Sequence, residues 1–511
     1  MPLHGGGSGG EQRGIFKLAG RGGGRGGVAT NVAEASITIP DVTVVIDTCR
    51  VKEMTFDSDL QTSQLQLKFA AQDSLRQRRG RAGRVQEGRC FRLITQGTYE
   101  KLPTHGVPEM LRVSLERVVL QVHTMLAVMQ TNKDTASGGA GAGTGARTGA
   151  GAGVGAGAGV GSQVPKRGAM SLLSRCPDPP TLPSVRAAEA VLQKLQALHP
   201  PDASHTTSIT SITPLGRLLS SLPCDPRVGK MIIYGALFRC AYPTSCVAAA
   251  LSVRSPFVTA QDAIGKVDAA KAHFSKGECI KSDFSIVCNL MSQFAAAGNK
   301  RSFCQQYGLS FERVAEIRDT QQDLLRGLVD LQLLPSVQEA LQPGSACNRN
   351  AQKGRLVAAT VGAGLYPQVA KILRPPKRFV EVVGGAVERD MIAREIKFYI
   401  PTSSSTGGTD ALALQSDFDV DYATRGLQRV FLHPSSVNFK NSQFREGNFV
   451  MYGERQLVTP YVEGKSSAQV APSKIYLREV TELTPYALLF FAGQVRCDYA
   501  QGIVAVDDMV R

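Results

Sequence analysis

Tryptophan, Cys-x-x-Cys pairs and long apolar runs are all missing from this sequence. The eleven cysteines are scattered from Cys49 to Cys497, and no His/Cys cluster has the spacing of a zinc site. This pattern indicates free thiols in a reducing compartment. No apolar run approaches the roughly 20 residues that cross a bilayer, and the opening MPLHGGGSGG lacks the apolar stretch of a signal peptide. We therefore expect a soluble intracellular protein, cytoplasmic or nuclear, with no membrane segment and no metal site.

Acidic residues are in the minority. The 511 residues include 58 Lys and Arg against 43 Asp and Glu, which gives a net charge of +15. A basic balance favours polyanionic partners, above all nucleic acid, because neutralised phosphates release counterions. A basic surface that only solubilises the protein explains the same balance equally well. The length allows about three or four domains.

The first part of the chain has an α/β pattern. The continuous apolar run Val42–Asp47 predicts a strand that is buried on both faces. Alternating runs around Met54–Phe56 and Leu65–Phe69, separated by turn residues, predict a hairpin.

A Gly/Ala-rich insert at 133–168 divides this part from the rest. Its GAGAG-like order offers too little side-chain surface to bury and predicts a disordered, flexible segment. A silk-like stacked sheet is the alternative, which one short copy does not favour. Beyond the insert, helical periodicity predicts helices at Val185–Leu198, Pro214–Leu222 and Val228–Cys240, and a further helix that Ser310 caps.

From Gly354 onward the pattern changes to short β-branched or aromatic runs separated by turn residues, which predict a small barrel or sandwich. The runs are RLVAATV, RFVEVV, EIKFYI, RVFLHP, NFVMYG and KIYLREV. A basic barrel that bears aromatic residues is compatible with an OB-fold, which often binds single strands.

The segment with the clearest chemistry is QRRGRAGR, Gln77–Arg84. It holds four arginines in eight residues, and Arg81 and Arg84 are spaced so that a helix would place both on one face. Two adjacent guanidinium groups suit a triphosphate, because each offers forked and permanently charged donors. The alternative is a generic basic patch or a nuclear localisation run, in which the interspersed glycines have no role.

A second motif, ATNVAEASITI at Ala29–Ile39, precedes the predicted buried strand. Small hydroxyl and amide side chains before a helix turn bind phosphates, although an ordinary capped turn has the same composition. Followed by QRRGRAGR, however, this motif resembles motifs V and VI of DEAH-type (DExH-box) ATP-dependent RNA helicases of superfamily 2.

The resemblance continues through nearly the whole chain apart from the Gly/Ala insert. PEMLRVSLERVVLQV and ITPLGRLLSSLP are similar to the winged-helix region, CDPRVGKMIIYGALFRC to the helical ratchet, and AGLYPQVAKI and VFLHPSSVNF to the OB-fold. It implies a multidomain α/β + α + β protein with four parts. These are a partial second RecA-like domain (1–97), a winged-helix region carrying the insert (98–221), a helicase-associated ratchet domain (222–344) and an OB-fold (345–511).

The resemblance also implies roles for single residues. Arg81 and Arg84 would be arginine fingers at the γ-phosphate of ATP, with Gln77 placing the attacking water. Phe16 would stack on the adenine and Asp41 would contact the nucleotide, although Pro40 stands where the family often has an acid. The residues that would bind RNA are His4, Gly5, Thr30, Asn31 and Thr38. The implied partners are RNA, single-stranded or at a duplex junction, and a protein cofactor such as a G-patch protein. We expect a monomer.

Two family motifs are missing: the sequence has neither G-x-x-x-x-G-K-[ST] nor an Asp-Glu-x-His box. The first cradles the β- and γ-phosphates and the second holds Mg²⁺. We therefore expect the chain to be the C-terminal part of a helicase, inactive alone, with the Mg²⁺ ligands on a missing first RecA-like domain. The alternative is an ATPase-less module, derived from a helicase, that binds RNA or a partner.

Overall fold

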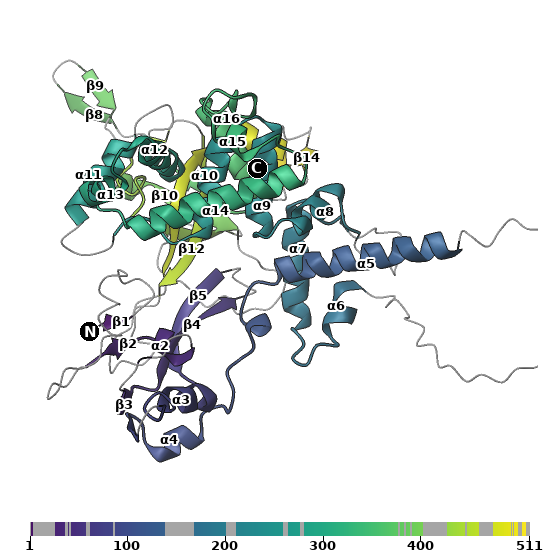
Figure 1. The fold of residues 1–511 in the computed structure, drawn as a ribbon. Coiled ribbons are helices and arrows are strands. Elements are labelled where there is room, and N and C mark those ends of the chain that lie inside the picture. Colours follow the sequence, from purple (N-terminus) through teal and green to yellow (C-terminus); the bar gives the residue numbers. More distant parts are fainter. Residues whose placement is uncertain are drawn as a thin grey trace, which may run out of the picture. The chain divides into compact units, whose positions relative to one another are not determined.

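The computed structural model describes most of the chain, in two compact units. Unit 1 comprises Met1–Asp57, Ser63–Ser114 and Pro177–Pro179, and unit 2 comprises the remainder. Figure 1 shows the helices and strands of both units. The described residues are 2–3, 26–35, 39, 42–57, 62–84, 87–137, 168–200, 211–258, 264–275, 281–376, 379–382, 385–388, 391–401, 427–444, 447–458, 474–491, 493, 495–498 and 503–506.

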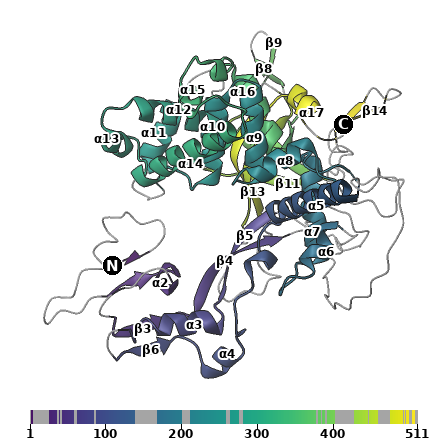
Figure 2. The same cartoon turned by 45° about the vertical axis from the view of Figure 1, so that its right-hand side comes forward.

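Unit 1 consists of short strands and helices around a small core. Strand β1 (Pro2–Leu3) pairs in parallel with β2 (Val28–Ala29), and β3 (Val44–Asp47) pairs in parallel with β6 (Arg89–Arg92). Strands β4 (Arg50–Asp57) and β5 (Thr62–Phe69) form a separate two-stranded sheet, as the predicted hairpin requires. The helices are α2 (Val32–Ala35), α3 (Gln72–Arg79) and α4 (Gln96–Glu100), and Figure 2 shows α3 beside β3 and β6. The core centres on Cys49, Ala70 and Leu75.

The prediction that Val42–Asp47 is buried on both faces is wrong. Val44 is 50% exposed and Ile46 is 68% exposed. Among the described residues β3 pairs only with β6, whose Phe91 is 53% exposed. An apolar run predicts what a strand can bury, whereas its exposure depends on which other layers cover it.

Unit 2 begins with helices. They are α5 (Glu116–Ser137), α6 (Gly168–Leu173), α7 (Leu182–Lys194), α8 (Pro214–Ser221), α9 (Pro226–Leu237), α10 (Ala241–Ser252), α11 (Ile264–Phe274), α12 (Asp283–Ala296), α13 (Lys300–Gln306), α14 (Phe311–Asp330), α15 (Val337–Leu341) and α16 (Gly354–Leu365). Ser310 caps α14 as predicted, since its hydroxyl accepts a hydrogen bond from the backbone N–H of Arg313. The predicted bounds of the disordered insert, 133–168, are wrong, because α5 runs to Ser137 and α6 begins at Gly168. Residues 138–167 lie outside the described part.

The strand-rich end of unit 2 contains a closed barrel of five strands in the order β10-β11-β13-β12-β7, the strand number of an OB-fold. The strands are β7 (Val369–Leu373), β10 (Lys397–Pro401), β11 (Leu427–Leu432), β12 (Phe449–Val458) and β13 (Lys474–Leu483). All pairs are antiparallel except β11 with β13.

Two of the predicted strands are not barrel strands. RLVAATV lies in α16, a helix whose second half is buried. RFVEVV lies in β8 (Phe379–Val382), which pairs with β9 (Gly385–Glu388) in a separate hairpin. The barrel strand that the prediction missed is β7. The chain continues with α17 (Pro485–Phe491) and the hairpin of β14 (Val495–Asp498) and β15 (Ile503–Val506). Within the described residues, no helix is long and apolar enough to cross a membrane.

The first turn of α12 is fixed to the barrel by a half-buried carboxylate. Asp283 accepts hydrogen bonds from the Ser436 hydroxyl at 2.6 Å and from the backbone N–H groups of Val437 and Val480 at 3.0 and 2.8 Å. Burial raises the pKa of Asp283, although these three hydrogen bonds oppose the rise. The loop after β11 is therefore held against α12 through hydrogen bonds to the Asp283 carboxylate.

Candidate functional site

Helix α3 positions the arginine-rich segment. Leu75 faces the core of unit 1, and the Gln72 side-chain amide donates to the carbonyls of Tyr99 and Leu102 at 3.1 and 3.0 Å. The helix ends at Gly80, whose N–H donates to the Arg76 carbonyl at 2.9 Å. Arg81 and Arg84 therefore follow the helix in a turn. The expectation that both lie on one helix face is wrong.

Arg78 is the anchor of this segment. Its Nε donates to Glu34 Oε2 and its Nη1 to Asp47 Oδ1, both at 3.0 Å, and Nη1 also reaches the Arg50 carbonyl at 3.2 Å. The Arg78 side chain is 14% exposed and that of Asp47 is 4% exposed. Burial lowers the pKa of Arg78, but Glu34 and Asp47 more than offset this and leave the pKa raised. One guanidinium group thus joins α3, α2 and the end of β3.

Arg81 is bound to the same acidic residue by a different group. Its Nε and Nη2 both donate to the backbone carbonyl of Glu34, the first at 3.1 Å. Partial burial and then the positive charge of Arg84 lower the pKa of Arg81, which stays charged at any physiological pH. Arg84 itself is exposed. The turn therefore presents two neighbouring cations, one held by α2 and one toward solvent.

Of the remaining predicted residues, three lie within the described part of the chain and five lie outside it. Gln77 is exposed on α3, and Thr30 and Asn31 are exposed directly before α2, where their carbonyls accept from the N–H groups of Ala33 and Glu34. The predicted residues outside the described part are His4, Gly5, Phe16, Thr38 and Asp41. The structure thus brings the turn after Thr30 and the turn after α3 together through Glu34.

Sequence reasoning missed the acidic residues. Glu34 is the acid within ATNVAEASITI, and Asp47 ends the apolar run of β3, so a search for acids near both motifs finds them. Both carboxylates bind Arg78, and Asp47 Oδ1 also accepts from the Cys49 N–H at 2.8 Å. Among the described residues, no group of three or more His, Cys, Asp or Glu is arranged to hold a metal ion. Guanidinium groups such as those of Arg81 and Arg84 carry permanently charged, forked donors of the kind that bind phosphate oxygens.

Three family models match separate parts of the chain. A helicase conserved C-terminal domain matches residues 1–86, a ratchet-like helicase associated domain (HA2) matches 225–304, and an oligonucleotide/oligosaccharide-binding (OB)-fold matches 357–495. The arginine cluster lies within the first match and the barrel within the third. The order of these domains defines the C-terminal module of a helicase.

Curated relatives align with nearly the whole chain. A putative DEAH-box ATP-dependent helicase from Mycosarcoma maydis is 30% identical over 99% of this chain and 28% of its own length. The ATP-dependent RNA helicase DHX29 of Mus musculus is 28% identical over 94% of this chain and 28% of its own length. The ATP-dependent DNA/RNA helicase DHX36 of Homo sapiens is 29% identical over 94% of this chain and 38% of its own length.

The chain thus spans 28–38% of the length of these three relatives. It belongs to the DEAH-type helicases of superfamily 2 and corresponds to their C-terminal portion.

Proposed function

We propose that the chain works as the C-terminal part of an ATP-dependent RNA helicase and supplies the arginine fingers and much of the RNA-binding surface. The observation that carries this proposal is the double attachment of QRRGRAGR to Glu34. The Glu34 carboxylate binds Arg78 and its backbone carbonyl binds Arg81. A basic patch or localisation signal requires no such attachment to a distant motif.

Each arginine of the turn has a separate task. Arg84, exposed beside Arg81, binds the γ-phosphate and stabilises the negative charge that spreads over its oxygens in the transition state. Arg81, in the turn after α3, binds the same phosphate while it stays hydrogen-bonded to the Glu34 carbonyl of α2, so its movement is passed to Thr30 and Asn31, which hold the RNA backbone. Gln77 orients the attacking water. Bound ATP supplies the phosphoanhydride bond whose hydrolysis drives movement along RNA.

The finer assignments are part of the same proposal. Helices α5, α7 and α8 form the winged-helix region of 98–221, supported by the hydrogen bond between buried His123 of α5 and Glu189 of α7 (3.1 Å). The helices of 222–344 form the ratchet and residues 345–511 the OB-fold domain. Mg²⁺ is bound by residues of a first RecA-like domain. A G-patch protein is a candidate partner of a monomeric helicase.

The decisive experiment adds a first RecA-like domain with a phosphate-binding loop to the N-terminus of this chain and measures RNA-stimulated ATP hydrolysis. Arg84→Ala should lower kcat by about 10³-fold, the usual contribution of an arginine finger. Arg318→Ala is the matched control, because Arg318 lies on α14, is exposed, and forms an ion pair with the adjacent Asp319. Equal kcat values for wild type and Arg84→Ala would sink the finger assignment.

The chain alone gives the second test. It should bind single-stranded RNA with an affinity that falls as salt rises, and it should hydrolyse no ATP. ATP turnover by the isolated chain would contradict the assignment of the metal ligands to another domain. Intact RNA binding combined with a fusion that never hydrolyses ATP would favour an ATPase-less binding module.

A further inference from the structure

Large apolar side chains are exposed around the C-terminal end of α9. They form the α17 patch, which consists of Leu237 on α9 and of Tyr486, Leu489 and Phe490 on α17. Tyr486 is 72% exposed and Phe490 is 80% exposed. The buried side chains of α17 are those of Ala487 and Leu488, so the helix places two aromatic rings in solvent. Exposed apolar side chains that gather in one place mark a site of contact with another molecule.

Aromatic contacts hold α17 against α9 and bring the two parts of the patch together. The centroid of the Phe491 ring lies 5.7 Å from that of Tyr234 and 5.4 Å from that of Phe238, which it meets edge to face. Helix α17 also packs against α16 (Figure 2). Pairs of this kind stabilise a packing arrangement beyond the area that they bury. Phe490, next to Phe491 in the chain, is therefore presented from a fixed backbone, and Leu237 adjoins Phe238 on α9.

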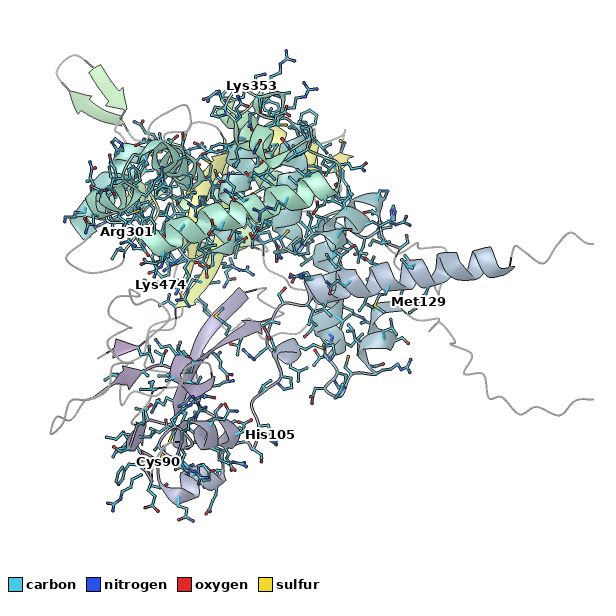
Figure 3. All side chains as sticks on the ribbon, viewed as in Figure 1. Cys90, His105, Met129, Arg301, Lys353 and Lys474 are labelled. Atoms are coloured by element: carbon cyan, nitrogen blue, oxygen red, sulfur yellow. The ribbon has the colours of Figure 1, made fainter. Side chains whose placement is uncertain are left out.

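Basic side chains lie beside the α17 patch, on the loop that closes the end of α9. Asn350 of this loop donates from its backbone N–H to the Arg239 carbonyl and from its side-chain amide to the Phe238 carbonyl, both at 2.9 Å. Exposed Arg349 precedes Asn350, and exposed Lys353, labelled in Figure 3, stands directly before α16. Arg239 is exposed as well. These three cations, Arg239, Arg349 and Lys353, form the basic rim of the patch.

A buried cation adds to this positive charge. Lys230 lies one turn before Tyr234 on α9, and its Nζ is buried 5.6 Å from the centroid of the Tyr234 ring, with no hydrogen-bond partner among the described residues. Burial lowers the pKa of Lys230 to about 8, so most of its ammonium group stays charged at pH 7. Burial and then the charge of Glu339 on α15 raise the pKa of Cys347, in the loop of the basic rim. One acid therefore accompanies four bases, and the surface is positive.

Exposed rings with a positive rim match a peptide that carries both apolar and acidic side chains, because rings bury at the centre of an interface and charges pair at its edge. We propose that the α17 patch and its basic rim bind an acidic segment of a partner protein. The Tyr486 and Phe490 rings take the apolar side chains of that segment, and the basic rim takes its carboxylates. This inference goes beyond the proposed function, since neither nucleotide nor RNA takes part.

The charges and the apolar residues favour this occupant over two others. A second copy of the chain, in a symmetric contact, would bring two basic rims together. RNA would pair with the rim, but Leu237 and Leu489 make half of the patch aliphatic, and bases stack on aromatic rings. An acidic segment with leucine or aromatic side chains satisfies both the rim and the whole patch.

The test selects peptides from a phage-displayed library of random 12-residue sequences on the immobilised full chain. Enriched peptides should combine Asp or Glu with Leu, Phe or Trp, and their affinity is then measured by fluorescence anisotropy. Phe490→Ala should weaken binding of the selected peptide by about 10-fold or more, the usual effect of losing a central aromatic anchor. Phe439→Ala is the matched control, because Phe439 is an exposed aromatic residue of the loop after β11, and it should leave the affinity unchanged.

A charge exchange tests the basic rim. Arg349→Glu should weaken binding of the selected peptide by about 10-fold, and replacing the peptide's acidic residues by lysine one at a time should restore the affinity at one position. Lys440→Glu, at an exposed position next to Phe439, is the matched control and should change nothing. Restored affinity excludes damage to the fold, because a misfolded variant would not recover with a changed peptide.

Three results would overturn the proposal. The first is a selection that enriches basic peptides or none, or peptides whose binding Phe490→Ala and Arg349→Glu leave unchanged. The second is dimerisation of the full chain in sedimentation velocity that Phe490→Ala abolishes, which would assign the patch to a second copy. The third is binding of a fluorescein-labelled oligouridylate that Phe490→Ala weakens as much as it weakens the peptide, which would assign the patch to RNA.

Discussion

Replacing Arg78 by alanine should destabilise unit 1 far more than replacing Arg84, although the two belong to the same run of four arginines. The change leaves Asp47, with a side chain 4% exposed, and Glu34, with one 15% exposed, without their cation. Removing one partner of a buried ion pair costs about 3–5 kcal/mol. Since Glu34 keeps some access to water, we expect a loss near the lower limit, about 3 kcal/mol, or roughly a 100-fold rise in local opening.

Native-state hydrogen exchange measures this directly, because it reports the free energy of opening segment by segment in a protein of several domains. Amides of α3 should exchange about 100-fold faster in Arg78→Ala and within a few-fold of wild type in Arg84→Ala, an exposed position. Arg78→Lys should fall between them, because a single ammonium group does not reproduce the forked contacts to two carboxylates. Unchanged protection of α3 in Arg78→Ala would refute the anchoring role.

Two further perturbations test unit 2. Burial, followed by the charge of Glu454, raises the pKa of Glu479 from 4.5 to about 7, so the folded state binds the extra proton between these values. Stability should therefore fall by about 3 kcal/mol as pH rises from 4.5 to above 7, and Glu479→Gln should remove most of this slope in urea denaturation at pH 5 and pH 8; an unchanged slope would contradict the assignment. In α16, a methyl group on Gly364 would lie 2.6 Å from a side-chain carbon of α9. Gly364→Ala should cost about 1–3 kcal/mol, whereas Gly265→Ala, at an open site on α11, should cost nothing; equal melting temperatures would count against tight packing.

The sequence predicted those helices and strands that bury one face against a single neighbouring layer, because their apolar residues then recur with a regular period. Strands β10, β11 and β13 alternate between the barrel core and the outside, and α14 presents a regular apolar stripe behind its Ser310 cap. The prediction failed for α16, because its residues 359–365 are all buried. The buried half of this helix has no polar face, so the short β-branched run that leads into it resembles that of a strand.

The candidate site shows a different limit of sequence reasoning. The spacing of QRRGRAGR identified a cluster of cations. The sequence alone, however, does not show which of its four arginines anchors the segment and which binds a ligand. The separation comes from partners distant in the sequence, since Glu34 and Asp47 bind Arg78 while Arg84 stays exposed. An ion pair requires its partners within about 4 Å, so only the fold can show that Glu34 and Asp47 lie beside Arg78. Arg78 neutralises Glu34 and Asp47 within unit 1, so we assign the anchoring role to Arg78 and keep the proposed phosphate contact for the exposed Arg84.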